Sequence, residues 1–103
     1  MDLNANTGAI ISLKEAQTFI NAFRKKYPDE IHSLFAGSNI IKRILDQEGC
    51  IGIRIYNGYN EQEQRLNSVL IGVNEQGEDI RTIIADDMRP CPHNCPKKDL
   101  ADE

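Results

Sequence analysis

The chain has 103 residues, of which 40% are hydrophobic and 27% are charged, and its formal net charge is −4. This length fits one domain with a single modest core, and the balanced composition excludes a disordered chain, a collagen-like repeat and a disulfide-dense miniprotein. We therefore expect one domain over residues 1–103, with an arm (1–11), a helical part (12–48), an antiparallel sheet (50–87) and a tail (88–103).

The first residues and the hydropathy pattern bear on where the protein works. Residues 1–8 carry an acid and two amides where a secretory signal would have lysines and a long apolar run. No stretch of the sequence approaches the roughly 20 apolar residues that cross a bilayer. Three cysteines in such a chain suggest a reducing compartment. These features predict a cytoplasmic protein that does not bind membranes.

Charge is distributed unevenly along the sequence. Residues 1–43 carry six basic and four acidic side chains, whereas residues 44–103 carry six basic and twelve acidic ones. The basic cluster from Arg24 to Lys26 lies at the end of an expected helix, where cations stabilise the helix dipole. Because nucleic-acid binding needs a clustered basic face, the sequence predicts no nucleic-acid partner.

The first expected helix has clear limits and one apolar face. Ser12 and Glu15 form a capping-box pattern that starts a helix at Leu13, and Pro28 ends it. Spacings of three and four predict a buried stripe, which we call the helix stripe: Leu13, Ala16, Phe19, Ile20, Phe23 and Tyr27.

Two shorter helices are expected next. Asp29 and Glu30 precede an apolar pattern that predicts a helix ending at Gly37. Ser38 then predicts the cap of a third helix, and Gly49 the left-handed residue after its last turn. The expected buried face of this third helix comprises Ile40, Ile41, Ile44 and Leu45.

After Gly49 the apolar period changes from about 3.6 to 2, which indicates strands. The expected strands are residues 50–56, 66–73 and 79–85, separated by polar connections. Helices followed by strands are typical of an α+β fold. We expect three helices on one face of a three-stranded antiparallel sheet, with the first helix supplying most of the cover.

The second face and the edges of this sheet lack an obvious cover. Arg54 and Tyr56 lie on that second face and form a candidate binding surface for an anion or a peptide. A three-stranded sheet also has two exposed edges, which pairing of two copies would remove. The sequence therefore suggests a homodimer.

The tail carries the best candidates for chemistry. Cys91, His93 and Cys95 offer thiolate and imidazole, the ligands that zinc prefers, but zinc usually takes four ligands and only the distant Cys50 and His32 remain. Three interpretations stay open: a proline-stiffened strap packed over the sheet, a Cys91–Cys95 disulfide, and a metal site.

The sequence also resembles a known group of proteins. The residues that carry the resemblance are the helix ending in Tyr27-Pro28, the stretch from Gly49 to Tyr56, the stretch from Val69 to Asn74, and Pro90 to Cys95. They are similar to small bacterial proteins of unknown function, of the kind found in Bacteroidetes. The resemblance implies a compact α+β protein with a Pro-Cys tail, and it supplies no activity, cofactor or catalytic residue.

These observations together predict a non-enzymatic interaction module that binds another protein or itself, without a cofactor. The sequence shows no catalytic constellation, so we assign no catalytic residue. The alternative function is a small thiol-redox or zinc-binding protein that uses Cys91, His93 and Cys95.

Overall fold

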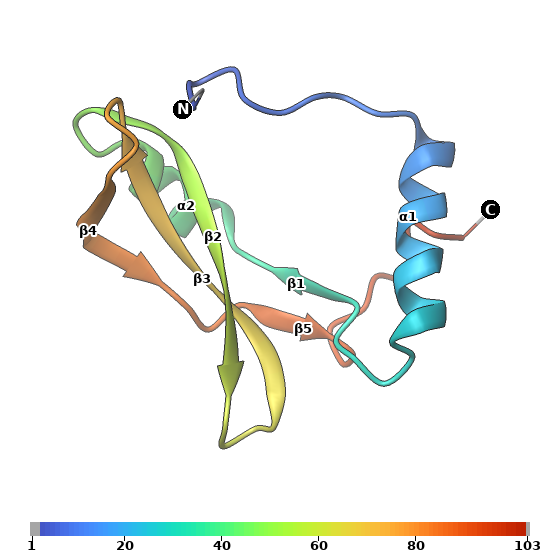
Figure 1. The fold of residues 1–103 in the computed structure, drawn as a ribbon. Helices are drawn as coiled ribbons and strands as arrows, with labels where there is room; N and C mark the ends of the chain where they lie inside the picture. The colour runs from blue at the N-terminus through green and yellow to red at the C-terminus, as the bar shows by residue number, and fades with distance from the viewer. Residues whose placement is uncertain (1–2, 103) are drawn as a thin grey trace.

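The computed structural model of the chain describes residues 3–102 and has an α+β architecture, as expected (Figure 1). These residues form two helices, a three-stranded antiparallel sheet and a separate two-stranded one. The elements in chain order are α1 (Leu13–Lys26), β1 (Ser33–Phe35), α2 (Ser38–Leu45), β2 (Cys50–Asn60), β3 (Arg65–Asn74), β4 (Asp79–Ala85) and β5 (Arg89–Cys91). No helix within this range has both the length and the apolar character needed to span a membrane.

Helix α1 begins and ends as the sequence predicts. The Glu15 backbone N–H donates to Ser12 Oγ at 3.0 Å, and the Glu15 side chain accepts from the Ser12 backbone N–H, which completes the capping box. The helix ends at Lys26, two residues before Pro28, and its last turn carries three cations.

The prediction of a second helix ending at Gly37 is wrong. Residues 33–35 form strand β1, which pairs antiparallel with β5 from the tail, with Ser33 opposite Cys91 and Phe35 opposite Arg89. The His32 N–H also donates to the Cys91 carbonyl at 2.8 Å. A helix this short is costly to nucleate, and the tail offers the segment a ladder of backbone partners instead.

Helix α2 replaces the predicted third helix, with a shifted start. Gly37 is its N-cap and Ser38 is already helical, so the expected Ser38 cap is not formed. Ile44 is fully buried, but Leu45, which we expected on the buried face, is exposed. Gly49 has a φ of +74°, the left-handed conformation predicted for it.

Strands β2, β3 and β4 form the predicted antiparallel sheet in sequential order. The β2–β3 hairpin is longer than expected, because residues 57–60 continue the ladder opposite residues 65–68. Gly77, with a φ of +80°, turns the chain from β3 into β4. The hairpin tip therefore projects beyond the rest of the sheet (Figure 1).

Helix α2, and not α1, packs on the sheet. The core comprises four buried residues: Ile44, Leu70, Ala85 and Met88. Gly72 in β3 permits the close approach, since a Cβ there would lie 3.0 Å from Cys50 Sγ and 3.3 Å from Ile44 Cγ2. The small core occupies only the half of the sheet beneath α2.

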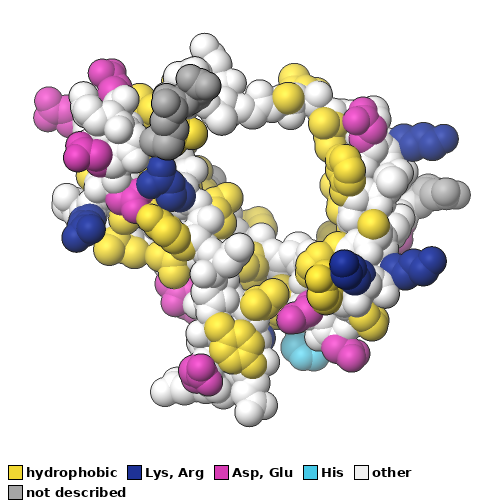
Figure 2. Space-filling model, in the orientation of Figure 1, with side chains coloured by type: hydrophobic (Ala, Val, Ile, Leu, Met, Phe, Trp, Pro, Cys, Tyr) yellow, Lys and Arg dark blue, Asp and Glu magenta, His cyan; other side chains and the backbone are white. Residues whose placement is uncertain are grey.

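The expectation that the first helix covers the sheet is wrong. No residue of α1 is buried, and the helix stands apart from the three-stranded sheet; residues 27–32 connect it to β1, and the N-terminal arm runs from its start toward β2 (Figure 1). The space-filling view shows an opening between α1 and the sheet, with hydrophobic side chains along its rim (Figure 2). Of the predicted helix stripe, Phe19, Ile20 and Phe23 lie toward this opening and not in a core, whereas Leu13 lies beside residues 98–102 of the tail.

Candidate functional site

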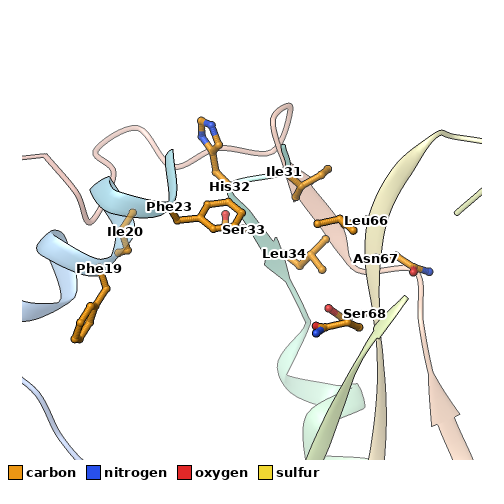
Figure 3. Close-up of a pocket in the computed structure, with 11 residues that line it drawn as sticks. Phe19, Ile20, Phe23, Ile31, His32, Ser33, Leu34, Leu66, Asn67 and Ser68 are labelled. Carbon is orange, nitrogen blue, oxygen red and sulfur yellow. The ribbon is translucent and has the colours of Figure 1, made fainter. Parts of the chain in front are cut away.

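An apolar cleft of about 660 Å³ lies between α1 and the hairpin. Helix α1, the segment from Ile31 to Leu34, and neighbouring positions of β2 and β3 contribute its walls (Figure 3). The lining side chains that are hydrophobic are Phe19, Ile20, Phe23, Ile31, Leu34 and Leu66.

The helix wall of the cleft is the middle of the helix stripe. Phe19 is 64% exposed, and Phe23 is partly exposed while its ring lies 5.2 Å from that of Tyr27. Aromatic side chains bury large areas and dominate contact energies when a partner covers them. The described chain leaves this aromatic wall exposed.

The sheet wall belongs to the same face that α2 covers further along. Ile55 pairs with Leu70 and Tyr59 pairs with Leu66, so alternation places all four side chains on one face. Leu70 is buried under α2, whereas the other three are exposed. We call Ile55, Tyr59 and Leu66 the open hairpin face.

Polar groups in the cleft do not form a catalytic pair. His32, Ser33 and Ser68 line it, and the His32 ring points away from Phe23 and Leu34 (Figure 3). Between residues 3 and 102, no hydrogen bond joins the His32 side chain to either serine. A nucleophile and its base normally lie within hydrogen-bond reach, and the described His32, Ser33 and Ser68 side chains are not arranged in this way.

The C-terminal tail holds α1 from its outer side. Arg24 Nη2 donates to Asp99 Oδ2 at 2.9 Å, and Gln17 Nε2 donates to the carbonyls of Leu100 and Asp102 at 3.2 and 3.1 Å. The hydrogen bond from Arg24, together with that from the Ala101 N–H, lowers the pKa of Asp99. We call these contacts the tail brace; they lie opposite the cleft.

The structure joins Cys91 and Cys95 by a disulfide with a Cα–Cα distance of 4.6 Å. Cys91 is 1% exposed at the end of β5, while His93 and Cys95 are exposed in the loop that follows. Zinc binds thiolates and not a disulfide. Within residues 3–102 no three His, Cys, Asp or Glu side chains are grouped to hold a metal, so the zinc site stays a prediction for the reduced chain.

Cys50, the suggested additional ligand, has a structural position. Its thiol is free and lies 3.2 Å from the Gly52 carbonyl oxygen, and the residue packs against the core under α2. It behaves as a small hydrophobic residue there.

Arg54 and Tyr56 lie on the opposite face of the sheet and share a partner. Both donate to the Asp79 carboxylate, and Arg54 also donates to the Gly77 carbonyl at 3.3 Å. Arg54 is opposite Ile71, and Asp79 is opposite Val73, so the ion pair spans β3 above these two residues, each 5% exposed. The candidate binding surface thus already contains a carboxylate.

Arg54 and Tyr56 share one face of the sheet, as their alternation in the sequence predicts, whereas no signal in the sequence pointed to Asp79. An acidic residue at the start of a strand, such as Asp79 in β4, is usually solvent-exposed and carries no special signal. Only the antiparallel register of the three strands brings Asp79 across β3 to Arg54. Arg54 lines a shallow cleft with residues 3–7, whereas His32 lines the apolar cleft, so the structure does not bring these two residues together.

Comparisons with protein-family models, curated proteins and solved structures find no match to this chain. The resemblance to small bacterial proteins stays a prediction, and the function has to be inferred from the geometry of the molecule.

Proposed function

We propose that the protein is a non-enzymatic interaction module and that its contact surface is the apolar cleft with its two walls, the helix stripe and the open hairpin face. The observation that carries this proposal is the accessible surface of 8196 Å². A compact monomer of 11.6 kDa exposes about 5,800 Å². The radius of gyration of 15.3 Å likewise exceeds the roughly 13 Å typical of this length.

The excess of about 2,400 Å² is summed over the whole chain, including the exposed arm and tail as well as the cleft walls, and it is larger than one association surface needs. A standard protein–protein interface buries about 800 Å² on each partner. Apolar area also stabilises a complex when it leaves water, at about 25 cal/mol per Å² before the costs of association. The exposed Phe19, Ile55 and Leu66 supply apolar area of the kind that anchors interfaces.

Chemical cross-linking through the lysines of α1 tests the proposal. Purified protein alone, and protein added to an extract of its source cells, is cross-linked and the products are identified by mass spectrometry. We expect the wild type to form cross-linked products with a partner, and we expect the Phe19→Asp variant not to form them. Ala22→Asp, which places the same charge on an exposed position of α1 outside the cleft, should retain them. Equal products from both variants contradict the proposal.

The disulfide favours a second candidate function, a thiol–disulfide protein. One sulfur belongs to a buried residue and the other to an exposed one, so an external thiolate can reach Cys95. In a full exchange the protein disulfide gains two electrons and two protons, while a donor dithiol is oxidised to its own disulfide. In the cytoplasm, the location that we propose, disulfides are usually transient and catalytic or redox-sensing.

A redox titration followed by native mass spectrometry tests this second candidate. We expect a two-electron transition that Cys95→Ser abolishes. Zinc is then added to the reduced form, and a mass increase of one zinc ion would support the metal interpretation. A disulfide that resists every cellular thiol donor, together with a reduced form that takes no zinc, contradicts both the redox and the metal alternatives.

A further inference from the structure

We infer that the partner in the apolar cleft is a second copy of this chain, which rests on the interaction function proposed above and identifies its partner. In this dimer, the helix stripe of each copy packs on the open hairpin face of the other. The contact is reciprocal, as a two-fold axis requires.

The first reason is that one chain carries both halves of the interface. The helix stripe and the open hairpin face border the same cleft, and each is longer than the part that lines it. Tyr27 continues the helix wall beyond the cleft, and Tyr59 and Ile55 continue the sheet wall, with Ile55 also lining the shallow cleft beside residues 3–7. A two-fold pairing covers both surfaces in both copies, whereas an unrelated partner needs two matching surfaces of its own.

The second reason is that charge does not oppose this packing. Helix α1 carries four basic side chains and one acidic one, a net of +3, whereas the hairpin of residues 50–74 carries two of each, a net of 0. Lys25 on α1 and Glu61 near the hairpin tip form no ion pair within residues 3–102, so a second copy can pair them across the interface.

The third reason is that the chain cannot close the cleft with its own helix while the tail brace is intact. Arg24 bonds to Asp99 and Gln17 bonds to the tail backbone, on the side of α1 opposite the cleft. The tail is itself tied to β1 through β5 and the Cys91–Cys95 disulfide. This arrangement holds α1 open for a surface that comes from outside the chain.

The area agrees with a homodimer. The excess of about 2,400 Å² per chain is spread over the arm, the tail and the cleft walls, and it exceeds the roughly 800 Å² per partner that a standard interface needs. Homodimer interfaces are also more hydrophobic than transient ones, in keeping with an interface built on Phe19, Phe23, Ile55 and Leu66.

Light scattering on a size-exclusion column, over a concentration series, tests the inference with two matched pairs of variants. Phe19→Asp introduces a charge into the helix stripe, and Ala22→Asp introduces the same charge elsewhere on the same helix as the control. Ile55→Lys attacks the open hairpin face, and Ile84→Lys is its control, because Ile84 is 59% exposed, Ile55 is 63% exposed, and they lie on opposite faces of the sheet. Circular dichroism checks the fold, and Phe19→Ala replaces Phe19→Asp if that variant does not fold.

We expect a wild-type mass twice that of the chain, a dissociation constant raised about tenfold or more by Phe19→Asp and by Ile55→Lys, and dimers for both controls. A wild-type dimer that neither variant weakens overturns this interface and leaves the interaction function standing. If the wild type is a monomer, small-angle X-ray scattering on the same sample gives its radius of gyration. A monomer near 15.3 Å overturns the second copy and leaves another protein as the partner. A monomer near 13 Å has closed the cleft with its own helix, which overturns the inference and the proposed function together.

Discussion

Arg24 and Asp99 link the outer side of α1 to the last residues of the chain, with Nη2 and Oδ2 2.9 Å apart. The tail therefore lies along the side of α1 that presents Leu13, Gln17 and Arg24. Phe19, Ile20 and Phe23 lie on the side that lines the cleft.

Replacing Arg24 with methionine should release the tail from α1. The pair is partly exposed, so we expect a small change in the thermal midpoint and a clear increase in amide exchange over residues 96–102. Hydrogen-exchange mass spectrometry measures this increase. Lys25→Met is the control, because Lys25 forms no ion pair within residues 3–102. Identical exchange in both variants means that Arg24 does not hold the tail.

Acid should release the same contact. The lowered pKa of Asp99 means that its charged form is favoured in the folded chain, so the contribution is fully present above the ordinary aspartate value of about 3.9. It is lost as the pH falls through the lowered pKa of the folded chain. Amide exchange of the tail should therefore rise in that acid range. Asp99→Asn should already show the fast exchange at neutral pH and lose the pH dependence.

Truncating Ile44 should destabilise the fold strongly. This residue is fully buried among Leu70, Ala85 and Met88, so Ile44→Ala should cost about 2–5 kcal/mol in the free energy of unfolding. Urea denaturation measures the loss. Leu45→Ala, at the neighbouring exposed position, should cost much less. Equal costs for the two variants would place the core elsewhere than under α2.

Adding a methyl group at Gly72 should also destabilise the sheet. Its Cβ would lie 2.9 Å from Gln47 Nε2 and 3.0 Å from Cys50 Sγ, so Gly72→Ala should cost about 1–3 kcal/mol by overpacking. Gly52→Ala is the matched control on β2, since a Cβ there has no described neighbour within 4 Å. We expect Gly52→Ala to be close to neutral in the same urea experiment. A neutral Gly72→Ala would contradict the close packing of α2 on β3.

Local signals in the sequence were sufficient for several elements. Ser12 with Glu15 predicted the start of α1 because a capping box acts within four residues, and the left-handed conformation of Gly49 was also predicted. The end of α2 was not, because the helix ends at Leu45 and residues 46–49 form a turn before β2. The change of period after Gly49 predicted the three strands of the larger sheet.

The remaining features depend on partners that are distant in the sequence. Residues 33–35 carry a helix-like apolar pattern, but the choice of a strand depends on a tail segment that contains Pro90, a residue that strands accept mainly at edges. The helix stripe shows that α1 has an apolar face, and periodicity does not state what covers it. Asp79 meets Arg54 only through the register of three strands.

The central claim is that association buries the helix stripe, and a single tryptophan tests it most directly because the chain has none of its own. Phe19→Trp places this reporter in the cleft, and Ala22→Trp places it on α1 outside the cleft. We predict that the emission of the first variant shifts from a solvent-exposed to a buried spectrum as the concentration rises or a partner is added, while the second stays exposed. A Phe19→Trp spectrum that stays exposed through an association seen by light scattering would contradict the account.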